Sequence, residues 1–154
     1  MPMNTFDFVN PTRIIFGKGQ IAKLAQYVPK DKKVLITYGG GSIKKNGVYD
    51  QVMKALEGYE VREFSGIESN PDYDTLMKAV AIVKEMGPDN TFLISVGGGS
   101  VADGTKFIAA AAYYTHSECA YEICQTDGKY MEKAVPLAVV LTLPAVCPLP
   151  TLHF

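Results

Sequence analysis

The chain has 154 residues, of which 47% are hydrophobic and 20% charged, and its formal net charge is −1 at pH 7. This composition is ordinary for one globular domain, and the near-neutral charge gives no electrostatic basis for binding nucleic acid. No apolar run reaches the length of a membrane span, and no signal peptide opens the chain. The three cysteines are irregularly spaced, which excludes a disulfide framework or a zinc knuckle. We therefore expect a cytoplasmic protein.

The first part of the chain predicts an edge structure followed by a helix and a buried strand. Residues 6–8 and 13–17, separated by a proline-containing turn, are typical of an N-terminal β-hairpin or a bent edge strand. A short helix is predicted over residues 18–27. The apolar run at residues 33–38 is typical of a strand that is buried on both faces.

The middle of the chain continues this alternation. Apolar residues four positions apart predict a helix over residues 43–56, and residues 60–65 alternate as in a half-covered strand. Because the residue before a proline avoids the helical conformation, the next helix should begin just after Pro71, with Asp72 or Asp74 as its cap, and end at Met86.

The last third predicts a strand at residues 91–96, an alanine-rich helix at 101–112 and a final strand at 135–143. Residues 113–130 are polar and carry only a weak helical pattern. Strands that alternate with helices indicate an α/β, Rossmann-like parallel sheet with helices on both faces.

Two glycine-rich turns follow buried strands of this predicted sheet, Gly39-Gly40-Gly41-Ser42 and Gly97-Gly98-Gly99-Ser100. Glycines allow a ligand to approach the backbone closely, and the start of the following helix favours a phosphate. Ligands of open α/β sheets bind outside the carboxyl ends of the strands, so the pair of turns predicts a dinucleotide and redox chemistry. One such turn alone could serve only to reverse the chain, and neither matches G-x-G-x-x-G or the P-loop.

The first turn also bears on the choice of cofactor. It contains no acidic residue, and Lys44 and Lys45 follow it. A carboxylate there would favour a free ribose 2′-hydroxyl, whereas cations favour a 2′-phosphate, so the sequence favours NADP over NAD. The alternative is that both lysines only face solvent.

Other polar residues near the turns allow two interpretations each. Ser100 and Asp103 have the spacing of a helix capping box, although Asp103 could instead lie beside the cofactor. Thr142 could donate to a nucleotide or satisfy its hydroxyl locally. His116 and His153 are too few and too far apart for a metal site, and there is no nucleophile motif, so the sequence predicts no catalytic and no metal-binding residue.

Five motifs, in the same order and spacing, resemble the N-terminal half of iron-containing (group III) alcohol dehydrogenases, in particular the NADP-dependent butanol dehydrogenases and broad-range aldehyde reductases. The resemblance extends from about residue 6 to residue 145. The motifs are residues 12–19, 39–42, 69–71, 97–106 and 141–145.

The resemblance implies a two-domain enzyme in which an N-terminal domain holds NAD(P) and a helical C-terminal domain binds Fe²⁺ or Zn²⁺ through one Asp and three His. The metal would polarise the alcohol or aldehyde oxygen while the nicotinamide exchanges a hydride. Implied cofactor contacts are Gly98, Gly99 and Ser100 at the pyrophosphate, Asp103 near the nicotinamide, Gly39, Gly40, Ser42 and Lys45 around the 2′-phosphate, and Thr142 at the adenine. Gly97, Asn70 and Leu143 complete the implied set.

The sequence departs from the family pattern after Ala145, where Val146 stands in place of a cofactor-binding threonine. We therefore expect a nucleotide-binding domain over residues 1–145 and an atypical tail over 146–154, as from a frameshift or premature terminus. Without the metal-binding domain, the chain should be inactive alone on small alcohols or aldehydes. The alternative is a non-catalytic fragment that folds or forms homo-oligomers; a glycerol dehydrogenase-like or dehydroquinate synthase-like domain fits the motifs less fully.

Overall fold

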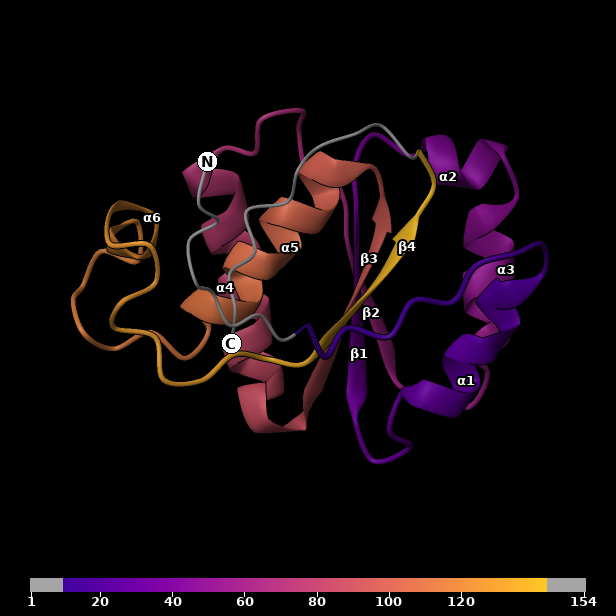
Figure 1. The fold of residues 1–154 in the computed structure, drawn as a ribbon, viewed down its shortest axis with the longest axis horizontal. Coiled ribbons are helices and arrows are strands. Elements are labelled where there is room, and N and C mark those ends of the chain that lie inside the picture. Colours follow the sequence, from indigo (N-terminus) through magenta and orange to yellow (C-terminus); the bar gives the residue numbers. More distant parts are fainter. Residues whose placement is uncertain (1–9, 144–154) are drawn as a thin grey trace, which may run out of the picture.

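The computed structural model describes residues 10–143, which form a parallel four-stranded sheet (Figure 1). The strand order is β2-β1-β3-β4, and every neighbouring pair is parallel. The predicted α/β, Rossmann-like class is confirmed. The strands are β1 (Lys33–Tyr38), β2 (Val61–Phe64), β3 (Thr91–Gly97) and β4 (Leu137–Leu141).

Helices cover both faces of the sheet (Figure 1). On one face lie α4 (Tyr73–Met86) and α5 (Gly99–Ala111). On the other lie the 3₁₀ turn η1 (Gln20–Lys23), α1 (Leu24–Tyr27), α2 (Ser42–Lys45) and α3 (Val48–Ala55). A second 3₁₀ turn, η2 (Pro88–Asn90), precedes β3, and the short helix α6 (Glu122–Gln125) lies beyond α5. No helix within residues 10–143 is long and apolar enough to cross a membrane.

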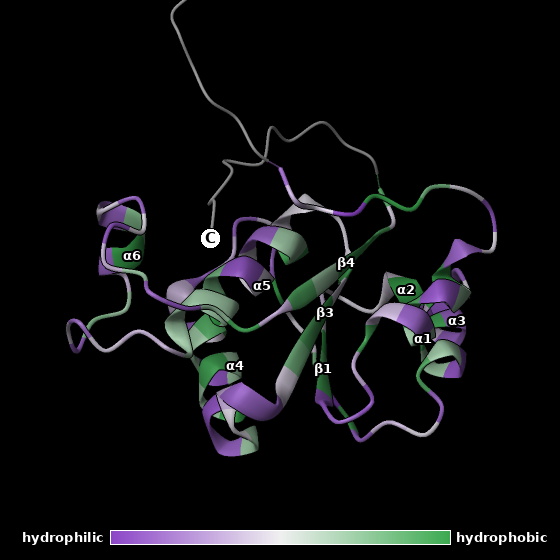
Figure 2. Ribbon diagram, turned by 60° about the horizontal axis from the view of Figure 1, so that its bottom comes forward, coloured by the Kyte–Doolittle hydropathy of each residue, from purple (hydrophilic) through white to green (hydrophobic). Residues whose placement is uncertain are grey.

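The two central strands supply the core because both of their faces are covered. Leu35 and Leu93 face the α4 and α5 side, whereas Ile36 and Ile94 face the α2 and α3 side, and all four side chains are fully buried. This explains why residues 33–38 and 91–96 are continuous apolar runs rather than alternating ones. Figure 2 shows β1 and β3 as hydrophobic ribbons between helices of mixed polarity.

The N-terminal hairpin is not found in the described residues. Residues 13–17 form no strand, and residues 6–8 lie outside the described range. Residues 10–19 are exposed, and the hydrogen bond of Thr12 N to Asn10 Oδ1 (3.0 Å) is local to the turn. The β-prone run at 13–17 therefore pairs with no strand of the described sheet.

The predicted helix over residues 43–56 is two helices, α2 and α3. Gly47 interrupts it with a φ of +76°, a left-handed conformation that glycine adopts without steric cost. The Asn46 side chain accepts a hydrogen bond from Val48 N (3.1 Å), which stabilises the new helix start. The spacing of apolar residues correctly predicted helical structure in both α2 and α3, but it did not indicate the break between these two helices.

The start and end of α4 are as predicted. The Asp72 side chain caps the helix by accepting hydrogen bonds from Asp74 N (2.9 Å) and Thr75 N (3.4 Å), so Asp72 rather than Asp74 is the cap. Gly87 ends the helix at a φ of +88°.

Close packing fixes α5 against α4 and the sheet. A Cβ on Gly104 would lie 3.0 Å from Leu76 Cδ2 and 3.2 Å from Ile67 Cγ2. On the sheet side, the buried Thr105 and Thr37 hydroxyls lie 2.5 Å apart, and Thr105 also donates to Val101 O (2.7 Å). Helix α5 is therefore held at a short distance from its neighbours by glycine on one side and a hydrogen bond on the other.

Replacing Gly104 with valine should test this packing. The added methyl groups must displace Leu76 and Ile67, so we expect Gly104→Val to lower the free energy of unfolding by about 1–3 kcal/mol. Gly40→Val is the matched control, because a Cβ at Gly40 has no neighbour within 4 Å in the described part of the chain. Urea unfolding followed by circular dichroism measures both; equal losses in the two variants would contradict the packing argument.

Candidate functional site

The connections of the sheet place a switch point between β1 and β3. From β1 the chain passes through α2 and α3 to β2 on one side, and from β3 it passes through α5 to β4 on the other. Ligands of open α/β sheets bind at such a point, outside the carboxyl ends of the two strands. Because Tyr38 pairs with Val96, the glycine turns that follow β1 and β3 begin at the same level of the sheet.

The first turn approaches the loop that follows β2. Gly39 O accepts a hydrogen bond from Gly66 N (3.1 Å), and Tyr38 O accepts one from Ile67 N (3.2 Å). A Cβ on Gly39 would lie 3.1 Å from Ile67 O, so a side chain there would press on backbone. A Cβ on Gly40 or Gly41 would meet no atom of the described residues within 4 Å, so none of them covers the outer part of the turn.

The second turn leads directly into α5. A Cβ on Gly97 would lie 2.9 Å from Val101 Cγ2, so only glycine fits at the end of β3. The carbonyl of Gly97 accepts a hydrogen bond from Thr142 N (2.9 Å), which places Thr142 beside this turn. Among residues 10–143, a Cβ on Gly98 has no neighbour within 4 Å and no side chain caps the helix. The first-turn N–H groups of this 13-residue helix thus have no side-chain cap from the described part of the chain at the switch point.

The predicted capping box is wrong. Helix α5 begins at Gly99 with Gly98 as its N-cap, two positions before the expected start, so Ser100 lies inside the first turn and cannot cap it. Asp103 is half-buried in the next turn, and its carboxylate makes no hydrogen bond or ion pair with other described residues. The capping pattern was misleading because the glycines themselves adopt the start of the helix.

Three further residues were predicted to contact the cofactor: Asn70, Leu143 and Lys45. Asn70 has a left-handed φ of +62° and precedes Pro71, which packs near Gly104 of α5. Leu143 is exposed and follows Thr142. Lys45 is the last residue of α2, is exposed, and makes no ion pair with any residue in the range 10–143. The structure thus brings the two turns and Thr142 together, and Lys45 lies at the end of the short helix that begins at Ser42 of the first turn.

A cluster that sequence reasoning missed lies beside the first turn. We call Tyr38, Lys44, Tyr49 and Glu63 the Glu63 cluster, because the Glu63 carboxylate joins the other three side chains. Burial raises the pKa of Glu63, but hydrogen bonds from the Tyr49 and Tyr38 hydroxyls and the charge of Lys44 outweigh it and hold the pKa below its usual value. No local pattern indicates this cluster, since its members come from β1, α2, α3 and β2.

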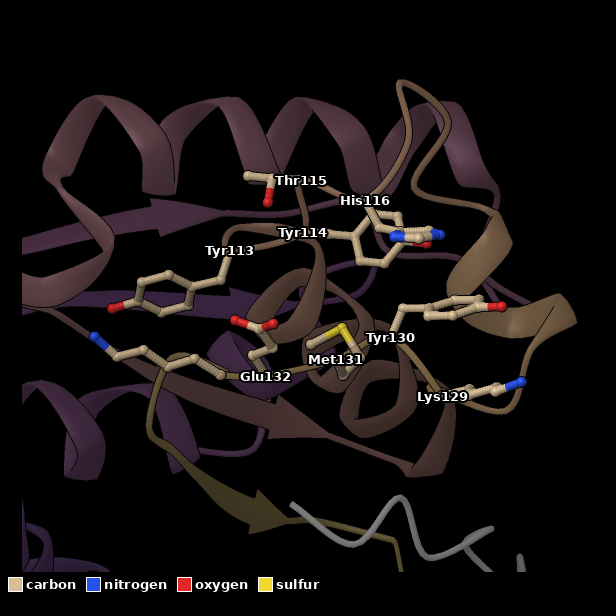
Figure 3. A pocket seen from close by; sticks show the side chains of 9 residues that line it. Tyr113, Tyr114, Thr115, His116, Lys129, Tyr130, Met131 and Glu132 are labelled. Atoms are coloured by element: carbon tan, nitrogen blue, oxygen red, sulfur yellow. The ribbon is translucent and has the colours of Figure 1, made fainter.

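A cavity of about 280 Å³ lies at the other end of α5 (Figure 3). His116 and Tyr130 stack there with ring centroids 4.0 Å apart, and Lys133 pairs with Asp89. About 13 residues of helix, or about 20 Å, separate this cavity from the glycine turns. None of the predicted cofactor residues lines it, so it is not part of the candidate site.

The described residues do not fit a catalytic metal. Within residues 10–143 there is no group of three or more His, Cys, Asp or Glu side chains that could hold an ion. The glycine turns do fit a dinucleotide, because they carry no side chains at the switch point and no other described side chain caps their backbone N–H groups.

Comparison with known proteins identifies the family. The sequence profile of the iron-containing alcohol dehydrogenases matches residues 11–148. The chain belongs to this family. It is 59% identical over 143 residues to the NADPH-dependent aldehyde reductase YqhD of Escherichia coli, and 47% identical over 146 residues to a probable NADH-dependent butanol dehydrogenase of Bacillus subtilis. Each match covers 93% of this chain but only 36% of the relative, so the chain spans about a third of their length.

Solved structures support the same assignment. The crystal structure of E. coli YqhD matches with a TM-score of 0.87 and 58% identity, over 92% of this chain and 36% of that one. The NADH-dependent butanol dehydrogenase A of Thermotoga maritima matches with a TM-score of 0.81 and 42% identity, over 92% of this chain and 35% of that one. The predicted family is therefore correct. The predicted boundary between residues 145 and 146 lies outside the described residues.

The two turn glycines offer a matched test of the site geometry. Gly97→Ala forces a Cβ against Val101 and should lower the free energy of unfolding by about 1–3 kcal/mol. Gly98→Ala adds the same methyl group into open space and should cost less than about 1 kcal/mol, the usual penalty for alanine at an N-cap. Urea denaturation separates the two; a Gly98→Ala variant as unstable as Gly97→Ala would contradict the described turn.

Proposed function

We propose that this chain is the dinucleotide-binding part of an NADP-dependent alcohol dehydrogenase or aldehyde reductase. The observation that carries the proposal is the β1–β3 register, which sets two glycine turns side by side at the switch point of the sheet. Family membership supports the redox class, and the relatives include an aldehyde reductase and butanol dehydrogenases.

In this proposal the pyrophosphate lies on the second turn. Gly98, Gly99 and Ser100 present backbone N–H groups at the start of α5, where the helix dipole favours an anion. Gly97 admits the ligand's close approach because it carries no side chain, and Thr142 stands beside it. Asp103, one turn along α5, would face the nicotinamide side, and Asn70 and Leu143 would flank the site.

The adenosine end would lie on the first turn, with NADP preferred to NAD. No carboxylate occurs between Gly39 and Lys45 to accept a ribose 2′-hydroxyl. Gly39, Gly40 and Ser42 would surround the 2′-phosphate, and Lys45, which has no acidic partner among the described residues, would supply positive charge. Both an NADPH-dependent and an NADH-dependent relative match this chain, so the comparisons do not decide between the two cofactors. The proposed preference for NADP therefore rests on the residues of the first turn.

When bound, the cofactor exchanges a hydride with an alcohol or aldehyde. The residues of this chain bind and orient it. Residues 10–143 hold no metal-binding group, so the metal of the whole family enzyme is assigned to no residue here.

Calorimetric titration of the 154-residue chain with NADPH and NADH tests the proposal directly. We expect saturable binding of both, tighter for NADPH. Lys45→Met should weaken NADPH about tenfold, the value of a charged hydrogen bond, and leave NADH nearly unchanged. Lys54→Met, which removes an exposed lysine from α3, is the control and should change neither affinity. Failure of the folded chain to bind either dinucleotide would refute the proposal.

A second candidate function, self-association, is favoured by exposed apolar side chains. Ile14 and Phe16 are 83% and 97% exposed, and Leu141 at the end of β4 is 54% exposed. Within the described residues β4 pairs only with β3, and it carries no charge, a combination that allows edge-to-edge pairing of sheets.

Sedimentation velocity over a range of concentrations tests this second candidate. We expect the sedimentation coefficient to rise with concentration, and Leu141→Lys to suppress the rise by placing a charge at the edge strand. Gln125→Lys adds the same charge on α6 and should have no effect. A wild-type chain that stays monomeric at high concentration would rule out the candidate.

A further inference from the structure

The Glu63 cluster lies beside the turn to which the 2′-phosphate is assigned. Tyr38 is the last residue of β1 and immediately precedes Gly39, while Lys44 lies in α2, two residues after Ser42. Glu63 comes from the neighbouring strand β2, and Tyr49 from α3. The cluster therefore ties the two ends of the first turn to the adjacent strand and helix.

Both oxygens of the Glu63 carboxylate are engaged. Tyr38 Oη donates to Oε2 (2.8 Å), and Tyr49 Oη donates to Oε1. Lys44 Nζ lies 3.8 Å from Oε2, so one carboxylate holds two phenols and one ammonium. Hydrogen bonds to an ionised acceptor are stronger and more directional than neutral ones, which favours one fixed arrangement.

Aromatic rings hold Lys44 from a second direction. Its Nζ lies 4.8 Å from the Tyr49 ring centroid and 5.3 Å from that of Tyr38, both within the range of a cation–π contact. The two rings meet edge to face, with centroids 6.4 Å apart. Lys44 is thus occupied by Glu63 and two tyrosines, whereas the adjacent Lys45 makes no ion pair with the described residues.

Both members of the ion pair are charged at neutral pH. The pKa of Glu63 lies below its usual value despite its partial burial, because two tyrosine hydroxyls and Lys44 favour the carboxylate. The pKa of Lys44 lies above its usual value, chiefly through its interaction with the Tyr38 hydroxyl and also through the charge of Glu63. Their charges cancel beside the turn, and Lys45 remains as its net positive charge.

We propose, resting on the NADP-binding function proposed above, that Lys44 and Glu63 form a compensated pair, in which Lys44 neutralises Glu63 so that this carboxylate does not weaken the preference for NADPH over NADH. Glu63 is a positioning residue, and Lys45, rather than Lys44, faces the phosphate. A carboxylate without its lysine would repel the 2′-phosphate, whereas NADH, which has no such group, would be almost indifferent to it.

A double-mutant cycle separates this role from direct binding by Lys44. The four proteins are the wild-type chain, Lys44→Met, Glu63→Gln and the double variant, each titrated with NADPH and NADH. Glutamine removes the charge and keeps one acceptor oxygen for a tyrosine hydroxyl, while its NH₂ group replaces the other oxygen and can donate to the second hydroxyl. We expect Lys44→Met to weaken NADPH about two- to fivefold, the range of an exposed charge interaction. The double variant should return to within about twofold of the wild type, and NADH affinity should stay within about twofold throughout.

Two further measurements exclude a merely structural effect. The loss in Lys44→Met should shrink at high salt, because ions screen charge repulsion but leave a packing defect unchanged. Lys45→Met should weaken NADPH by the same factor in the wild-type and double-variant backgrounds, since Lys45 lies outside the pair. Far-ultraviolet circular dichroism and urea midpoints verify that each variant is folded.

The outcomes are distinct. If Lys44→Met and the double variant lose NADPH affinity equally, Lys44 itself contacts the phosphate and the inference is wrong. If the wild type binds NADPH and all four proteins keep the same NADPH-to-NADH ratio, the inference fails while the proposed function stands. If the folded wild type binds neither dinucleotide, the proposed function fails and the inference falls with it.

Discussion

The parallel pairing of β1 with β3 is the constraint on which the rest of the structure depends. Six consecutive residue pairs, from Lys33 with Thr91 to Tyr38 with Val96, fix the register. A slip of one residue would place Leu35 and Leu93 on opposite faces of the sheet, so that one of them would turn away from α5, and would also shift one glycine turn relative to the other. The same register therefore builds the core and aligns the two halves of the candidate site, so stability and binding cannot be separated at these strands.

Helix α5 converts this alignment into a binding surface, and it can do so only by approaching the sheet closely. The glycines at 97 and 104 leave no room for a Cβ, at the strand end in the first case and against α4 in the second. The Thr37–Thr105 contact then fixes the helix above β1. If α5 lay further from the sheet, its first-turn N–H groups would not reach the switch point. This is the physical reason for glycine at positions 97 and 104, where a larger side chain would push the helix outward.

The sequence was sufficient for features that are local and insufficient for those that join distant residues. Strand β1, the Asp72 cap and the turns were predictable because apolar runs, Pro71 and consecutive glycines each act within a few residues. The break at Gly47 and the early start of α5 were missed because glycine suits both a turn and a helix end. The Glu63 cluster could not be predicted from a local pattern, because the Glu63 carboxylate accepts hydrogen bonds from Tyr49 and Tyr38, which lie 14 and 25 positions away in the sequence.

Charge near the first turn follows from the same geometry. Two adjacent lysines are equivalent in the sequence, yet α2 directs Lys44 onto the tyrosine rings and leaves Lys45 without an acidic partner in the described chain. The β1–β2 pairing places Glu63 opposite Ile36, in the residue pair before the last one of these two strands. This position brings the Glu63 side chain close to α2. The register of the outer strand thereby determines which lysine is neutralised. A property usually assigned to the turn itself, its preference for a phosphate, would then depend on a strand that contributes no residue to the turn.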